Sequence, residues 1–295
     1  MKQDQTSKSN KKTGKAARIF RTLGIILLCL VLALYVLFPV TMGAIAAMRS
    51  AQKAEPPPDG FEAVTLTVGD GTALACWFTP GENGAAIITG KSNLASLTQQ
   101  RCYTMRVTAF CANPARAWRQ RRRGNAFGWQ CGRDVAAAVD YLPVQGVDQI
   151  GALGLSMGSE VLLDSAADEP AIKAVVADGA SQRSLADYLV PESNRSLWRS
   201  WTTRVMYASV RLTGQTPPER TLLSSILDAK DTRFLFIAAG NVEKEPLFGE
   251  IYHDAVPERS ALWIVRNGAH AGADDRAGRV CFASSRFSTR HCVSE

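Results

Sequence analysis

The feature that most constrains this chain is an uncharged run of 27 residues, from Thr22 to Met48. At about 1.5 Å per residue, a helix of this length exceeds the ~30 Å hydrocarbon thickness of a bilayer. A cleaved signal peptide is the alternative, because small residues lie near the end of the run, but the apolar region of such peptides is usually only about 7 to 15 residues long. The run therefore predicts an uncleaved transmembrane anchor over residues 22–48, in which Pro39 can be tolerated.

Basic residues are distributed unevenly around this run. Seven Lys and Arg residues precede it within residues 1–21, whereas only Arg49 and Lys53 follow closely. Because Lys and Arg are enriched on the cytoplasmic side of membrane helices, we expect residues 1–21 to be a cytoplasmic tail and the body to lie on the exoplasmic side of the cell membrane. Residues 49–60 contain three consecutive prolines and are predicted to be a spacer before a domain of residues 61–295.

The net charge of +7 does not favour a nucleic-acid partner. Residues 1–21 carry a balance of +6 and residues 91–123 one of +8, so the rest of the chain is acidic. A general attraction to nucleic acid is therefore not expected, and an Arg-rich binder of nucleic acid or anionic lipid that uses Arg116 to Arg123 is the least favoured function. The seven cysteines form no CxxC pair, so no metal site is expected either.

Short apolar runs alternate with helical segments along the body. Residues 63–78 predict a hairpin, because two β-rich runs flank the turn-forming sequence GDGT. Buried strands are predicted by five further runs, at residues 85–89, 150–155, 172–178, 233–240 and 261–265. Strands that alternate with helices indicate an α/β fold with a mostly parallel sheet covered on both faces.

More than fifty residues without a strand pattern separate Asp178 from Arg233. We expect a helical lid here, at about residues 181–225. Trp198, Trp201 and Tyr207 lie on its longest helical segment. These aromatic residues either line an acyl or aromatic pocket or take part in ordinary helix packing.

The strongest chemical motif is the G-x-S-x-G sequence from Gly154 to Gly158. It follows a buried strand and begins a helix, which is where a nucleophile elbow forms; the alternative is a purely structural turn. The elbow interpretation makes Ser156 the nucleophile. It also places the backbone amide of Met157 at a helix N-terminus, where it can donate to a tetrahedral oxyanion.

A serine nucleophile needs a base and an acid that orients it. His270 follows a predicted buried strand and comes after the serine, whereas His253 lies in a polar segment and His291 is close to the last residue. We therefore predict His270 as the base. Glu243 lies three residues after the Gly240 turn and is predicted as the acid; Asp178, at the end of the preceding strand, is the other candidate.

These residues resemble the α/β-hydrolase superfamily, and in particular small membrane-anchored bacterial serine hydrolases. The resemblance covers residues 61–89 and 125–270, including the motifs NAFGW, GLSMGS, VVADGAS and FLFIAAGNV. It implies hydrolysis of an ester, thioester or amide of a small-molecule or peptide substrate through an acyl-serine, without a metal or organic cofactor. The family places a second oxyanion amide after the strand at 85–89, where only Gly90 and Lys91 are candidates here.

Two stretches depart from this resemblance. Residues 91–123 lack acidic residues, helical periodicity and any clear strand beyond TMRVTAF, although the family has a strand and a Gly-His-Gly turn there. If residues 113–123 are back-translated with GC-rich codons and these codons are read one base later, the product is TPRGHGASGG, which contains that turn. Residues 280–292 read two bases later give MFRVVAFFDAAL, an amphipathic helix.

We therefore hypothesise that residues 91–123 and 277–295 are translated out of the native reading frame. A family-specific basic loop is the alternative. A frameshift predicts loss of a central strand and of the oxyanion loop, and hence an impaired enzyme. Resequencing that finds an intact frame across these codons, with no nearby insertion or deletion, would exclude the hypothesis. The remaining functional alternative is a noncatalytic membrane-tethered protein that keeps the hydrolase scaffold.

Overall fold

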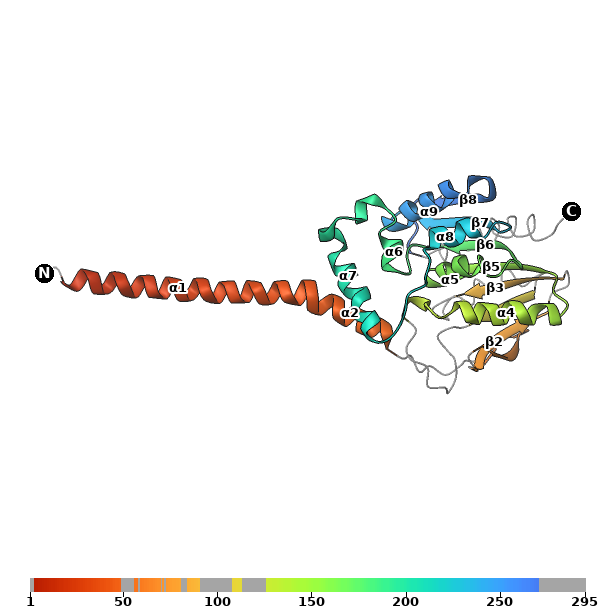
Figure 1. The fold of residues 1–295 in the computed structure, drawn as a ribbon, viewed down its shortest axis with the longest axis horizontal. Coiled ribbons are helices and arrows are strands. Elements are labelled where there is room, and N and C mark those ends of the chain that lie inside the picture. The colour runs from red at the N-terminus through yellow and green to blue at the C-terminus, as the bar shows by residue number, and fades with distance from the viewer. Residues whose placement is uncertain are drawn as a thin grey trace.

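A computed structural model describes residues 3–48, 56–57, 59–69, 71, 73–80, 84–90, 108–112 and 126–270. Figure 1 shows a long helical rod at the N-terminus that leads into an α/β body. The rod consists of α1 (Gln3–Leu32), a π-helical segment η1 (Ala33–Leu37) and α2 (Phe38–Ala47). Residues 18–47 of this rod are long and apolar enough to cross a membrane.

The body is built on an eight-stranded, mostly parallel sheet, as predicted. Its strand order is β1-β2-β4-β3-β5-β6-β7-β8. Strands β1 and β2 form the expected hairpin, and all the strands from β3 to β8 run parallel to one another. The strands are β1 (Glu62–Thr67), β2 (Ala73–Thr79), β3 (Ala85–Gly90), β4 (Thr108–Ala112), β5 (Gln149–Leu155), β6 (Ile172–Asp178), β7 (Arg233–Ala239) and β8 (Ser260–Val265).

Strand β4 falls within the stretch suspected of a frameshift. It pairs antiparallel with β2 and parallel with β3, so it occupies the central position whose loss the hypothesis predicted. The rest of residues 91–123, and all of residues 277–295, lie outside the described part of the chain.

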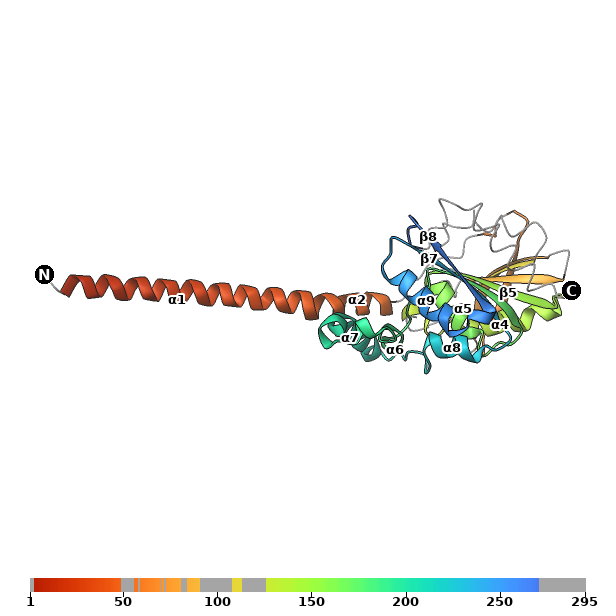
Figure 2. The same ribbon diagram turned by 90° about the horizontal axis from the view of Figure 1, so that it is seen from above.

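Four helices pack on one face of the sheet (Figure 2). They are α4 (Gly132–Val144), α5 (Met157–Ser165), α8 (Leu222–Asp228) and α9 (Lys244–Ala255). A second buried cluster lies on the other face of the sheet. It consists of strand residues that alternate with those of the first cluster, such as Leu153 and Ile237. Burial on both faces explains why the strands are continuous apolar runs rather than alternating ones.

The segment between β6 and β7 is helical, as expected for residues 181–225. It contains α6 (Leu185–Tyr188), the 3₁₀ turn η5 (Glu192–Asn194), α7 (Leu197–Leu212) and α8. In both views α7 lies beside α2, at the point where the rod reaches the body. The predicted insertion therefore contacts the predicted anchor. Two further 3₁₀ turns, η4 (Ala126–Gly128) and η6 (Pro257–Arg259), precede α4 and β8.

Candidate active site

A sharp turn presents Ser156 between β5 and α5. Its backbone has φ 53° and ψ −125°, a conformation that non-glycine residues rarely adopt and that is typical of a strained nucleophile elbow. The Ser156 amide donates to the carbonyl of Asp178 at 2.8 Å, which ties the turn to β6. Gly154 is required here, because a Cβ at this position would lie 2.2 Å from the Cα of Ser159. The G-x-S-x-G sequence thus folds as the motif predicts.

The structure brings His270 to this serine. Ser156 Oγ and His270 Nε2 are 2.8 Å apart, although 114 positions separate the two residues in the chain. His270 follows β8 by a short loop, and about half of its side chain is exposed. An unprotonated Nε2 in this position can accept the hydroxyl proton of Ser156, which is the geometry required of a general base.

A buried carboxylate orients the other side of the imidazole, and it belongs to Glu245 rather than to Glu243. Glu245 Oε1 lies 2.5 Å from His270 Nδ1, and its Oε2 accepts the backbone N–H of Ala239 at 2.7 Å. The Glu245 side chain is only 2% exposed, so solvent competes weakly for these contacts. Nδ1–H donation to this carboxylate fixes the tautomer in which Nε2 is free to act as a base.

Glu243 is exposed and lies at the N-cap of α9, so the structure does not place it against His270. The physical reason is that α9 begins immediately after it: Glu245 lies in the first helical turn, facing back toward the end of β7. Asp178, the other sequence candidate, is buried at the end of β6 beside Leu155. The choice between two glutamates two residues apart depends on where α9 starts, which the spacing of Glu243 from Gly240 does not define.

The other two histidines are not part of this arrangement in the described residues. His253 is on α9, and its Nδ1 lies 2.7 Å from Ser260 Oγ. His291 lies outside the described part of the chain.

The oxyanion candidates lie at the same edge of the sheet. Met157 is the first residue of α5, so its amide is among the unpaired donors of a helix N-terminus. Gly90 is the last residue of β3 and pairs in register with Gly154 of β5, which puts it next to the elbow. Lys91, the alternative donor, lies outside the described residues.

A buried acid lies one turn beyond the nucleophile. Glu160 of α5 accepts hydrogen bonds from the backbone N–H and the hydroxyl of Ser181 at 3.0 and 3.1 Å. Burial raises its pKa to about 7, while the Ser181 hydrogen bonds and the nearby Arg183 charge oppose that rise. Glu160 therefore titrates near neutral pH. Its hydrogen-bond partner is Ser181, so it is not part of the Ser156–His270–Glu245 series.

The raised pKa predicts a pH-dependent stability that Glu160→Gln removes. Between about pH 4.5 and 7 the folded chain holds a proton on Glu160 that the unfolded chain has lost, so the free energy of unfolding falls as pH rises through this window. The expected fall is about 3 kcal/mol at most, from about 1.4 kcal/mol per pKa unit. Glutamine keeps an acceptor for Ser181 and does not titrate. Urea unfolding at several pH values measures the free energy of unfolding of the parent and of Glu160→Gln. If both free energies changed with pH in the same way, the prediction would be contradicted.

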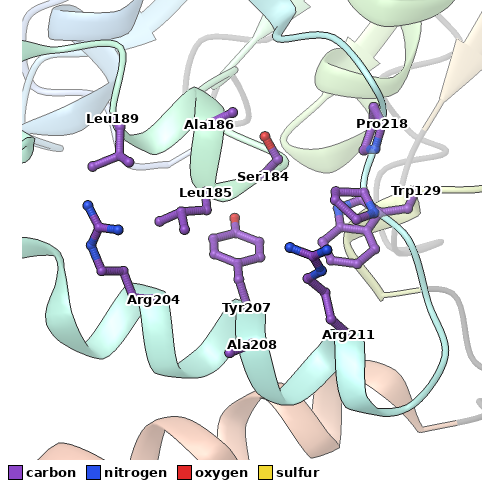
Figure 3. Close-up of a pocket in the computed structure, with 11 residues that line it drawn as sticks. Trp129, Ser184, Leu185, Ala186, Leu189, Arg204, Tyr207, Ala208, Arg211 and Pro218 are labelled. Atoms are coloured by element: carbon purple, nitrogen blue, oxygen red, sulfur yellow. The ribbon is translucent and has the colours of Figure 1, made fainter.

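A pocket of about 590 Å³ lies between α6 and α7 (Figure 3). Tyr207 points from α7 into it and stacks on Trp129, with ring centroids 6.0 Å apart. Arg204 and Arg211 of α7 flank Tyr207. Tyr207 thus lines a pocket, whereas Trp198 and Trp201, predicted with it, lie against Tyr35 and line a different groove. Within the described residues, no cluster of three or more His, Cys, Asp or Glu side chains could hold a metal.

Known structures resemble this fold over most of their length. An esterase from Pyrococcus furiosus superposes with a TM-score of 0.59 at 16% identity, over 83% of this chain and 99% of its own. An alpha/beta hydrolase from Penicillium sp. sh18 gives 0.60 at 15%, over 79% and 99%, and a dienelactone hydrolase from Anabaena variabilis gives 0.54 at 16%, over 79% and 98%. No family model and no curated protein sequence matches the chain. At these identities the likeness establishes the fold alone.

Proposed function

We propose that this chain, which has the α/β-hydrolase fold, is a membrane-anchored serine hydrolase that cleaves an ester, thioester or amide through an acyl-serine. The observation that carries the proposal is the continuous series from Ser156 Oγ to His270 Nε2 and from His270 Nδ1 to Glu245 Oε1, at 2.8 and 2.5 Å. A nucleophile, a base and a buried orienting acid in this order are the functional parts of a catalytic triad. That the similar structures include esterases agrees with this chemistry.

The geometry supports the following steps of the proposed reaction. Ser156 Oγ attacks the acyl carbon while His270 Nε2 takes its proton, and the resulting oxyanion accepts a hydrogen bond from the Met157 amide. The proton on His270 then passes to the leaving group, which departs and leaves an acyl-serine. Water attacks the acyl carbon with His270 again acting as base. The collapse of the second tetrahedral intermediate releases a carboxylic acid and restores Ser156. Glu245 stabilises the imidazolium at both stages.

The rod supports membrane anchoring. Its apolar segment, residues 18–47, contains an 18-residue window with a mean hydropathy of 2.9, and almost none of that window is buried by the body, unlike the core helix of a soluble protein. The end of the rod packs on α7, a contact that a cleaved signal peptide would not make. The basic residues on the N-terminal side of this segment support an orientation with the catalytic domain on the exoplasmic side of the cell membrane.

A fluorophosphonate probe tests the catalytic proposal and separates it from a noncatalytic scaffold. The purified full-length chain is expected to displace fluoride from the probe through Ser156 Oγ. Mass spectrometry of the proteolysed adduct should then locate the phosphonyl group on Ser156 and not on the nearby Ser159 or Ser165. Heat-denatured protein is the control and should remain unlabelled, because labelling needs the folded base. A folded chain that is not labelled, or is labelled elsewhere, would support the noncatalytic alternative.

A further inference from the structure

A proline inside the predicted anchor leaves a backbone carbonyl without its usual donor. Pro39 has no backbone N–H, so it cannot bond the carbonyl of Tyr35, four residues earlier. The helix is locally π-helical over Ala33–Leu37 at this point. In hydrocarbon an unpaired carbonyl is costly, because no water is present to replace the donor. A donor from outside the helix can therefore compensate for the missing N–H at the level of Tyr35.

Helix α7 supplies that donor. Trp201 Nε1 donates to the Tyr35 carbonyl at 3.0 Å, across 166 positions of the chain. The neighbouring Trp198 ring packs on the Tyr35 ring, with centroids 5.3 Å apart. The amino-terminal end of α7 is thus matched to the part of the anchor that the proline disrupts.

The contact continues along the rest of the anchor. Gly43 is buried against α7, where a Cβ would lie 2.0 Å from Ser209 Oγ and 2.6 Å from the Met206 carbonyl oxygen. Close approach at a small residue is typical of helices that pack inside membranes. Beyond α7, Gln215 Nε2 donates to the carbonyl of Ala47 at 3.4 Å. Helices α2 and α7 therefore form one unit, and the depth of the anchor in the bilayer determines the depth of α7.

Helix geometry places the start of that unit within the bilayer. Tyr35 lies 14 residues after Arg21, which is about 21 Å along the axis at about 1.5 Å per residue. The hydrocarbon layer is ~30 Å thick. With Arg21 at its inner boundary, Tyr35 lies about 9 Å inside the outer boundary. If the hydrocarbon layer extends farther toward the body of the protein, Tyr35 lies deeper below that outer boundary. Trp198 and Trp201 share the level of Tyr35, so they lie in the outer leaflet.

The surface of this end of α7 suits lipid. Leu197 is 65% exposed and Trp198 is 74% exposed, and both line an open apolar groove of about 460 Å³ between α7 and the rod. Tryptophan is enriched where hydrocarbon meets the headgroups. The flanking Arg199 is exposed, and its long side chain can extend toward the lipid headgroups.

We propose that residues 197–201 of α7 insert into the outer leaflet beside Tyr35, so that the lipid bilayer is the partner of this helix end. The inference rests on the membrane anchoring proposed above and adds a second, non-spanning contact with the membrane. Its consequence for the enzyme follows from the fold: η4 contacts α2 on one side and α5, which begins at the nucleophile, on the other. Insertion of α7 thereby fixes the orientation of the active site relative to the membrane surface.

Quenching of tryptophan fluorescence by lipids brominated on their acyl chains tests this directly. The full-length chain is reconstituted in phosphatidylcholine vesicles with and without brominated lipid, and the lost emission is compared with that of Trp198→Phe. We expect Trp198→Phe to remove about half or more of the quenchable emission, because Trp201 is less exposed than Trp198 and the other tryptophans among the described residues, Trp77, Trp129 and Trp263, belong to the body. Trp129→Phe is the matched control, since Trp129 is buried in the body, and it should leave the quenchable emission unchanged.

The outcomes separate this inference from the anchoring proposal. Vesicle flotation after alkaline extraction reports the anchor alone. If the chain floats with the vesicles but Trp198→Phe loses no quenchable emission, the anchor stands and the insertion of α7 is wrong. If the chain does not float, both proposals fail. Flotation together with the loss of quenching in Trp198→Phe, but not in Trp129→Phe, supports the insertion.

Discussion

Replacement of Ser156 by alanine is expected to lower kcat for short-chain p-nitrophenyl esters by about one million-fold, the loss known for the serine of a catalytic triad. The variant loses the oxygen that the structure places 2.8 Å from His270 Nε2, so no acyl-enzyme can form. Residual hydrolysis would come from substrate binding and the oxyanion donors, which stabilise attack by water to a limited extent. KM should change little, because the hydroxyl contributes to the transition state more than to ground-state binding.

The interpretation of that loss depends on a folded variant. Alanine is compatible with the β5–α5 turn to the same degree as serine, so thermal unfolding should occur within a few degrees of the parent. Ser224→Ala, on the distant helix α8, is a matched control that should keep full activity. If Ser156→Ala retained more than a few per cent of the parent kcat, a different nucleophile would have to be sought and the triad assignment would be wrong.

Residues with a local signature could be predicted from sequence. The elbow was predictable because glycine at 154 and a strand followed by a helix are local requirements, and His270 because only three histidines exist. The buried strands were predictable because strands buried on both faces are continuous apolar runs. Strand β4 was only partly recognisable, since it covers five residues of a stretch whose composition has no clear pattern.

Features that depend on tertiary placement were not predictable in the same way. The pairing of Trp201 with the Tyr35 carbonyl joins two segments 166 positions apart, and the sequence showed only a tolerable proline and an aromatic helix. The sequence likewise left open whether Trp198, Trp201 and Tyr207 act together. The structure divides them between the anchor groove and the pocket beside Trp129. The acid was misassigned for a smaller reason, because two residues at a helix start decide which glutamate faces inward.

Glu245→Gln provides the sharpest test of that reassignment. Glutamine is similar in shape but carries no charge, and its amide N–H₂ cannot accept the Nδ1–H proton if it takes the place of Oε1. The imidazole would then favour the tautomer with a proton on Nε2, which cannot act as a base toward Ser156. By analogy with the corresponding change in a serine protease, kcat should fall by about ten thousand-fold.

Glu243→Gln is the matched control, since it makes the same chemical change two residues earlier on an exposed side chain. It should leave kcat within about twofold, because surface substitutions away from the site usually have small effects. The reverse pattern, with a large loss of kcat in Glu243→Gln and little in Glu245→Gln, would restore the sequence-based choice, because only a carboxylate in contact with the imidazole can produce so large a loss.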